Sequence, residues 1–339
     1  MTDTNASFPA RVTAGFDRFG GVLWLPVLLA IVALLLIGQP STWATLTIAG
    51  LAMGMMIFLM ASGLSLIFGL MDVLNFGHSA FVTAGAFIGA TVLAWLGFWV
   101  TGSNPALNVM GLLIAITVAT VFGALAGWFF ERVVIRPVYQ DHLRQILITV
   151  GALIVAEELV LLVWGGAPIP VPRPAALTGS FVLGGVSVEI YRIFAFLLGL
   201  AVYIAMYLVL NRTRLGLLIR AGVENREMVE ALGFRIDRLF ILVFMAGSAL
   251  AAMGGAMWAG YQGLITAAIG SEMMILVFIV VIIGGLGSIQ GSLLGAILVG
   301  LMANYVAFLM PKMALASNML LMMTILLWRP YGLLPAVKR

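Results

Sequence analysis

The sequence predicts an all-α integral membrane protein: a polytopic helical bundle of about ten transmembrane spans, some of them broken. Hydrophobic residues make up 63% of its 339 residues and charged residues only 9%, and the mean hydropathy is +1.18. A soluble domain carries about 25% charged residues, and a disordered chain has low hydrophobicity. The composition therefore excludes both of these classes.

Ten apolar stretches are candidate spans. A hydrocarbon core about 30 Å thick needs roughly 20 apolar helical residues. The expected division is a cytoplasmic tail at 1–20, a transmembrane domain at 21–328 and a second cytoplasmic tail at 329–339. The expected spans are 21–37, 43–68, 77–97, 108–130, 145–164, 189–210, 239–260, 273–288, 291–310 and 316–328.

The first stretch, 21–37, has the features of a span rather than a secretion signal. Arg11 and Arg18 precede it, and it ends at Gly38-Gln39-Pro40. A signal peptide ends instead in a small-x-small cleavage site. We expect this stretch to remain in the protein as a helix.

The positive residues predict the orientation. With the N-terminus inside and an even number of spans, 14 of the 17 Lys and Arg residues lie on the cytoplasmic side. Positive residues collect on that side of membrane proteins. Both termini are therefore expected in the cytoplasm. The excess of basic over acidic residues reflects membrane topology rather than nucleic-acid binding. The three exceptions are Arg173, Arg192 and Lys312.

Two polar or glycine-rich segments predict breaks inside the apolar region. Residues 69–78 (GLMDVLNFGH) bring in Asp72, Asn75 and His78, and residues 284–288 (GGLGS) hold three glycines. Irregular backbone at membrane depth is tolerated only where protein or a watery cavity satisfies it. Paired interrupted segments point to the translocation path of a transporter.

Two acids stand in an apolar span. Glu157 and Glu158 lie within residues 154–160 (IVAEELV). An ionised carboxylate is costly there unless it faces the bundle interior or a cavity. Two interpretations stay open: contact with a polar substrate or gate, and a helix–helix hydrogen bond near the outer surface.

The external loop 165–188 contains Pro168, Pro170, Pro172 and Pro174. Proline disfavours a helix, so we expect a compact cap. It is either a plain connector or part of a docking surface for an external partner.

The cytoplasmic loop 211–238 predicts a two-turn helix near 226–232, with Asn225 as its N-cap and Gly233 as its end. Such a helix is unstable alone in water, so its apolar side must rest on something. One interpretation is packing on the chain's own spans. The other is a coupling helix that docks into a groove on a cytoplasmic motor subunit.

Several enzyme classes lack support in the sequence. The chain has no cysteine, and its two lysines, Lys312 and Lys338, do not follow a glycine. A Walker A loop needs Gly-Lys-Ser/Thr, so the chain has no ATPase site of this kind. No nucleophile elbow and no H-E-x-x-H occurs. His78 has no second histidine three or four residues on, so we expect no metal site and no cofactor.

Four blocks together resemble permeases of branched-chain amino-acid ABC importers of the LivH type. The blocks are residues 63–69 with 75–81 (GLSLIFG, NFGHSAF), 224–227 with 230–233 (ENRE, EALG), 284–288 with Gly291 and Gly295, and 329–333 (RPYGL). The resemblance covers about residues 43–335 and leaves out the stretch 21–37.

The resemblance implies a multi-pass permease subunit in a bacterial cytoplasmic (inner) membrane. Its implied partners are a second, similar permease in a heterodimer, two cytoplasmic ATP-binding subunits, an extracytoplasmic solute-binding protein, and lipid. Members of this family also carry urea, short amides or aromatic acids, so these substrates stay open. The residues implied to couple to the ATPase are Glu224, Asn225, Arg226, Glu227, Met228, Val229, Glu230, Ala231, Leu232 and Gly233.

The expected mechanism is alternating access, in which the loop helix transmits motor closure to the spans beside the two breaks. The main rival is an ion-coupled secondary transporter, which would need its own ion or proton sites. A lipid-acting membrane enzyme would need a clustered catalytic set that the sequence lacks, and a purely structural subunit fits the composition. The candidate substrate-path residues are Asn75, His78, Ser79, Thr83, Glu158, Ser288 and Gln290.

Overall fold

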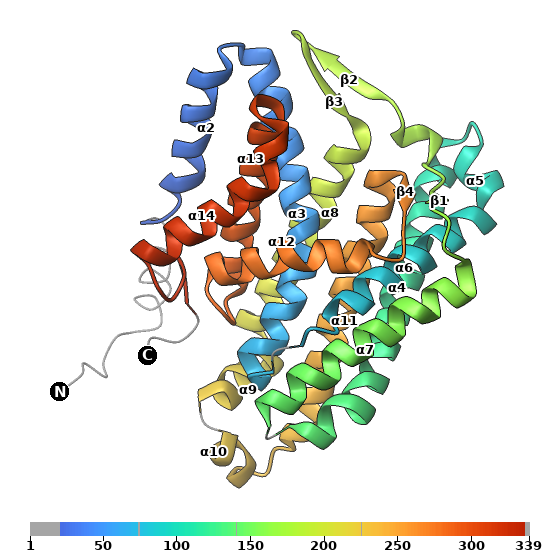
Figure 1. Ribbon diagram of the computed structural model, residues 1–339. Coiled ribbons are helices and arrows are strands. Elements are labelled where there is room, and N and C mark those ends of the chain that lie inside the picture. The colour runs from blue at the N-terminus through green and yellow to red at the C-terminus, as the bar shows by residue number, and fades with distance from the viewer. Residues whose placement is uncertain (1–20, 74, 140, 225, 336–339) are drawn as a thin grey trace.

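The computed structural model in Figure 1 describes residues 21–73, 75–139, 141–224 and 226–335. Eight helical segments within them are long and apolar enough to cross a membrane. The helices are α2 (Trp24–Ile37), α3 (Pro40–Met71), α4 (His78–Trp95), α5 (Gly97–Thr101), α6 (Pro105–Phe130), α7 (His142–Trp164), α8 (Ile190–Arg212), α9 (Arg214–Glu224), α10 (Arg226–Ala231), α11 (Ile236–Gln262), α12 (Ile269–Gly284), α13 (Ile289–Leu309) and α14 (Ala314–Trp328). Short π and 3-10 turns continue α6, at Glu131–Ile135 and Arg136–Val138, and two further 3-10 turns lie at Ala175–Leu177 and Pro311–Met313.

The helical prediction is confirmed, and the count of ten spans is approximate. Each expected span matches an apolar helix, but α2 has only 14 residues and α12 only 16. Figure 1 shows α12 running across the front of α3 instead of beside it. The expected span 273–288 is therefore a crossing helix that begins at Ile269 and ends at Gly284.

Helix α3 is the central element of the bundle. Its 32 residues pack against α8, α11, α12 and α13, and Met55 to Ala61 are all buried. Pro40 suits the first helical turn, where its missing N–H costs no hydrogen bond. Asp72, with a φ of 52°, ends the helix in the left-handed conformation and donates its N–H to the Phe68 carbonyl. The core of the protein is thus arranged around one long apolar helix.

Small residues allow the helices around α3 to approach closely. Helix α4 crosses α11 with Gly85 against Ala252 and Gly89 against Ala256. A Cβ atom at Gly85 would lie 2.1 Å from the Ala252 carbonyl oxygen. In lipid, where helices gain little hydrophobic energy by associating, such contacts supply the packing.

Small residues along α13 make the same kind of contact. Gly291 of α13 lies against Gly284 of α12, and Gly295 lies against the Val280 carbonyl. Farther along, Gly300 of α13 lies against Gly50 and Gly54 of α3. These small residues therefore pack α13 against α12 and α3.

The two predicted breaks are present. Helix α3 ends at Met71 and α4 begins at His78, and no regular element includes residues 72, 73 or 75–77. His78 Nε2 lies 2.9 Å from the Met60 carbonyl, so α4 begins beside the middle of α3. At 1.5 Å per residue this point lies about 15 Å back from the end of α3. We call the described residues between the two helices, 72, 73 and 75–77, the returning segment, because α4 begins beside the middle of α3 and not at its end.

The second break is a tight turn between α12 and α13. Gly285 and Gly287 have φ angles of 99° and 77°, which L side chains rarely adopt. The chain after α14 folds back on this turn, with Leu333 N–H donating to Ile283 O and Leu334 N–H to Gly284 O. The first part of the expected tail 329–339 therefore packs against the membrane domain.

The external loop 165–188 contains strands that the proline pattern did not reveal. Strand β1 (Ile169–Pro170) pairs with β4 (Leu264–Ile265), and β2 (Ser180–Leu183) pairs with β3 (Val186–Glu189), both antiparallel. Gly184 and Gly185, at φ of 58° and 82°, make the two-residue hairpin turn. Figure 1 shows this hairpin at the end of the molecule opposite α9 and α10.

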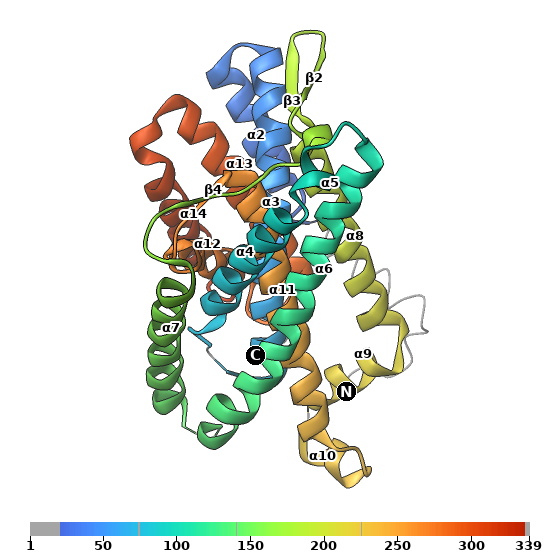
Figure 2. The same ribbon diagram turned by 90° about the vertical axis from the view of Figure 1, so that its right-hand side faces the viewer.

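The opposite end carries two short helices where one was expected. Helix α10 agrees with the helix expected near 226–232, while its expected cap, Asn225, lies outside the described residues. Helix α9 was not predicted. Gly222 of α9 lies against Leu70 and Leu239, so α9 rests on the end of α3. Figure 2 shows α9 and α10 together below the bundle.

We predict that Gly85→Ala lowers the stability of the detergent-solubilised chain by about 1–3 kcal/mol, the usual cost of overpacking. The new methyl group would overlap Ala252 and push α4 away from α11. Gly151→Ala on α7 is the matched control, because a Cβ atom there meets nothing within 4 Å. Thermal unfolding measures both, and equal midpoints for the two variants would contradict the packing account.

Candidate functional site

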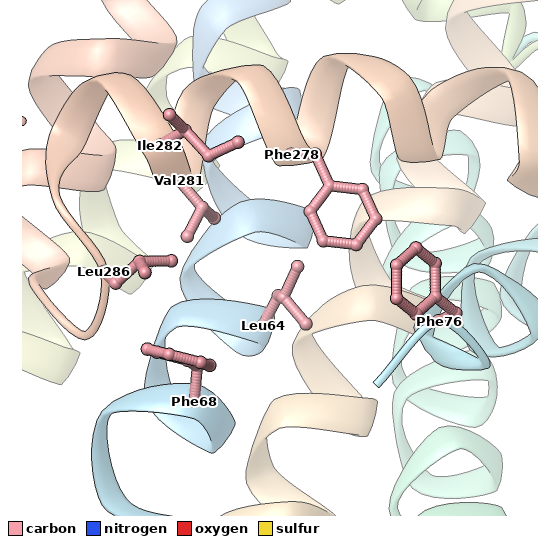
Figure 3. Close-up of a pocket in the computed structure, with 7 residues that line it drawn as sticks. All are labelled: Leu64, Phe68, Phe76, Phe278, Val281, Ile282 and Leu286. Carbon is pink, nitrogen blue, oxygen red and sulfur yellow. The ribbon is translucent and has the colours of Figure 1, made fainter. Parts of the chain in front are cut away.

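An apolar pocket lies between the two breaks. Its cavity volume is about 340 Å³, at the small end of the roughly 300–1,000 Å³ typical of ligand pockets. Figure 3 shows the side chains around it, which come from α3, the returning segment, α12 and the turn that follows α12. The lining residues are Leu64, Phe68, Phe76, Phe278, Val281, Ile282 and Leu286.

Helical spacing places most of these side chains. Leu64 and Phe68 are one turn apart on α3, and Phe278, Val281 and Ile282 follow the i, i+3, i+4 pattern on α12. Residues at these spacings share one helix face. Because α12 crosses α3, the two faces meet at an angle and enclose a pocket.

The two breaks supply the remaining walls. The rings of Phe76 and Phe278 have centroids 5.1 Å apart at an angle of 47°, and Figure 3 shows them side by side. Leu286 stands between Gly285 and Gly287, whose backbone conformations place it on the pocket rim, where it is 44% exposed. The pocket therefore depends on both breaks.

The chemistry of the pocket is recognition of an apolar group. All seven lining side chains are aliphatic or aromatic hydrocarbons, so they exclude water and attract apolar surface. None of them is an acid, a base or a nucleophile. Among the described residues, no group of three or more His, Cys, Asp and Glu side chains is placed to hold a metal ion.

Four of the sequence-predicted path residues are buried and do not line the pocket. Asn75, His78, Ser79 and Thr83 are at most 1% exposed. Ser79 donates to the Phe76 carbonyl at 3.2 Å, and Thr83 Oγ accepts from the Gly270 N–H at 3.2 Å. These side chains support the backbone that carries Phe76 and the start of α12. Their role in the path stays a prediction.

The remaining predicted path residues lie in three different settings. Ser288 caps α13 by accepting from the Gly291 N–H at 3.0 Å. Gln290 is half-buried in the first turn of α13, close in sequence to Leu286. Glu158 is exposed on α7, whereas the neighbouring Glu157 accepts a hydrogen bond from Ser271 of α12. The structure thus shows Glu157 as the acid that faces a neighbouring helix.

The predicted coupling residues form the end of α9, all of α10 and the turn after it. Glu224 ends α9, and Arg226 begins α10. Val229 is 3% exposed, while Met228 and Leu232 are 60% and 69% exposed. The expected apolar side is therefore divided: Val229 packs inward on the chain itself, and two large apolar side chains point outward.

Sequence reasoning did not identify the seven pocket residues as a site. It looked for polar side chains in apolar surroundings, whereas the pocket is made of ordinary Leu, Ile, Val and Phe. In sequence these cannot be distinguished from core residues. The signal that did locate the region was the pair of breaks, which border the pocket on two sides.

The chain matches the family described as "Branched-chain amino acid transport system / permease component" over residues 46–328. It is 30% identical over 297 residues to the high-affinity branched-chain amino acid transport system permease protein BraD of Pseudomonas aeruginosa, covering 84% of this chain and 93% of that protein. It is 26% identical over 292 residues to the LivH permease protein of Escherichia coli, with the same coverage of the two chains.

A solved structure, an inward-facing conformation of a metal-chelate type ABC transporter, is similar with a TM-score of 0.47 and 20% identity. The similarity covers 92% of this chain and 95% of that one. The family match spans most of the chain and makes this chain a transport subunit. Together with the apolar helices, it makes the chain a multi-pass inner-membrane protein. This chain belongs to the family of permease components of branched-chain amino acid transport systems.

Proposed function

We propose that this chain is the transmembrane subunit of an ATP-binding-cassette importer that carries branched-chain or other small amino acids into the cytoplasm. The observation that carries the proposal is an apolar pocket enclosed by two helix breaks in a chain of this permease family. Broken helices near the membrane midplane are where transporters bind their substrates.

The pocket suits the side chain of such a substrate. An aliphatic side chain gains about 0.8 kcal/mol for each buried CH₂ group, and the seven hydrocarbon side chains offer that burial. A charged side chain would lose its hydration there without a partner. The pocket therefore favours apolar amino acids over charged ones.

The charged amino and carboxylate groups of the substrate need polar partners along the path. Ser288 and Gln290 are the proposed contacts, because both are half-buried and follow Leu286 closely in the chain. Asn75, His78, Ser79, Thr83 and Glu158 remain proposed path residues for other stages of transport.

The α9–α10 end is the proposed cytoplasmic end. Arg136, Arg212, Arg214, Arg235 and Arg238 lie in or beside the elements at this end, as the positive-inside rule requires. At the opposite end, Arg173 and Arg192 pair with Glu189 at 3.6 Å and 3.0 Å. In this orientation both termini lie in the cytoplasm.

The proposed partners are those that the family resemblance implies, assigned here to the two ends. Two ATP-binding subunits supply the energy from the α9–α10 side, where the loop 211–238 acts as the coupling region. An extracytoplasmic binding protein delivers the amino acid at the hairpin end, and a second, similar permease completes the path as a heterodimer. The exposed Met228 and Leu232 are the side chains that fit a groove on an ATP-binding subunit.

We predict that Met228→Glu combined with Leu232→Glu reduces ATP-driven uptake at least about tenfold in the reconstituted complex, because burying unpaired carboxylates in an apolar groove is costly. Co-purification of the ATP-binding subunits should fall in parallel. Leu143→Glu at the start of α7, outside the loop 211–238, is the control, since Leu143 is similarly exposed at 68%. Full uptake by the double variant would show that the coupling surface lies elsewhere.

We also predict that Phe278→Ala shifts the substrate preference towards larger side chains. The variant widens the pocket, and a single methylene in an apolar pocket already changes specificity about tenfold or more. The ratio of phenylalanine uptake to valine uptake should rise by about that factor. Phe308→Ala on α13, at a 52% exposed position, should leave the ratio unchanged. If Phe278→Ala leaves the ratio of phenylalanine uptake to valine uptake unchanged, the pocket does not lie on the substrate path.

A further inference from the structure

Side chains from the turn before α7 and from α7 itself hold the returning segment, one just before its start and one near its end. At its start, the Tyr139 hydroxyl donates to the Met71 carbonyl at 3.2 Å. Near its end, the Phe76 N–H donates to Thr149 Oγ at 3.3 Å. These two bonds fix the backbone on either side of Asn75. The second bond is made by Phe76, whose ring lines the pocket.

The two fastening residues are themselves joined through Gln145. The Gln145 side-chain amide donates to the Tyr139 carbonyl at 2.8 Å, and Thr149 Oγ donates to the Gln145 carbonyl at 2.7 Å. Gln145 and Thr149 are 1% and 0% exposed. Buried hydrogen bonds are costly to break, so Tyr139, Gln145 and Thr149 move together.

The same unit is in contact with the cytoplasmic end of α11. The ring of Tyr139 stacks on Phe240, with centroids 5.3 Å apart at 12°. Arg136 pairs with Asp237 at 3.5 Å between the same two regions. Helix α11 begins soon after α10, and the Phe234 N–H donates back to Val229 of α10 at 3.3 Å. A displacement of α10 therefore reaches Phe240, and through it Tyr139.

The start of the returning segment has a backbone conformation that its surroundings must hold. Among the described residues, Asp72 is the one non-glycine residue with a positive φ, at 52°. Such a conformation is costly for a residue with a side chain and persists where the surroundings hold it. The Tyr139 hydroxyl bonds the carbonyl of the residue directly before it.

We propose that Tyr139 is a positioning residue for transport, which passes movement of α10 and α11 from Phe240 to the returning segment. Its ring receives the movement, and its hydroxyl transmits it to the backbone that leads to Phe76. The proposal rests on the proposed function, because it assumes that ATP-binding subunits move α10. It adds a named path between the coupling surface and the pocket, which are otherwise separate parts of the molecule.

The first test is Tyr139→Phe in the complete reconstituted importer. The variant keeps the stack on Phe240 and loses the bond to the Met71 carbonyl. Amino acid taken up per ATP hydrolysed should fall about two- to tenfold, the effect of one neutral hydrogen bond on an equilibrium, while ATP hydrolysis and assembly persist. Tyr207→Phe on α8 is the matched control, and its ratio should equal that of the unaltered complex.

The second test uses Thr149, where the shape of the side chain can be kept. Thr149→Val removes the oxygen that accepts from Phe76 and should lower the same ratio, whereas Thr149→Ser keeps that oxygen and should restore it. A purely structural role would instead lower thermal stability and leave the ratio unchanged.

The outcomes separate the two proposals. An unaltered complex that hydrolyses ATP without uptake would overturn the proposed function and this inference with it. If the unaltered complex transports, but Tyr139→Phe and Thr149→Val both take up as much amino acid per ATP hydrolysed as Tyr207→Phe, only the role of Tyr139 is overturned.

Discussion

Hydrocarbon offers no hydrogen-bond partner to a backbone, and the structure depends on how the chain meets this constraint where its helices stop. Each unsatisfied N–H or C=O group there costs several kcal/mol. The returning segment meets the constraint with side chains from the α6–α7 region, which accept from Phe76 and donate to Met71. The turn after α12 meets it with the chain that follows α14, whose N–H groups bond Ile283 and Gly284. Both breaks are therefore held by distant parts of the sequence.

This arrangement explains why the pocket lies where it does. Continuous helices pack side by side and leave little space between them, whereas an interrupted helix leaves space beside the break that a ligand can occupy. Phe76 and Leu286 each belong to a break, and α3 and α12 close the space between them.

The sequence predicts the helical class, the positions of the spans and both breaks, because these depend on local signals. A long run of apolar residues predicts a span, and glycines near Asp72 and Asn75 within such a run predict an interruption. The orientation of α12 could not be predicted, since its 16 residues are mostly apolar and resemble part of a span, and its direction follows from packing against α3, α4 and α13. Helix α9 was missed because Gly216 and Gly222 lower its helix propensity, and its stability comes from contact with Leu70 and Leu239. The partners of Tyr139 and Thr149 are long-range contacts that no local pattern contains.

The length of α3 has a consequence for how the protein sits in a bilayer. Its 32 residues extend about 48 Å, against a hydrocarbon thickness of about 30 Å. A helix of that length must lean or emerge from the lipid, and its close contacts with α11 and α13 prevent it from leaning by itself. The excess length of about 18 Å must therefore emerge from the hydrocarbon at one end or both, so a change in bilayer thickness would act on the whole bundle packed around α3.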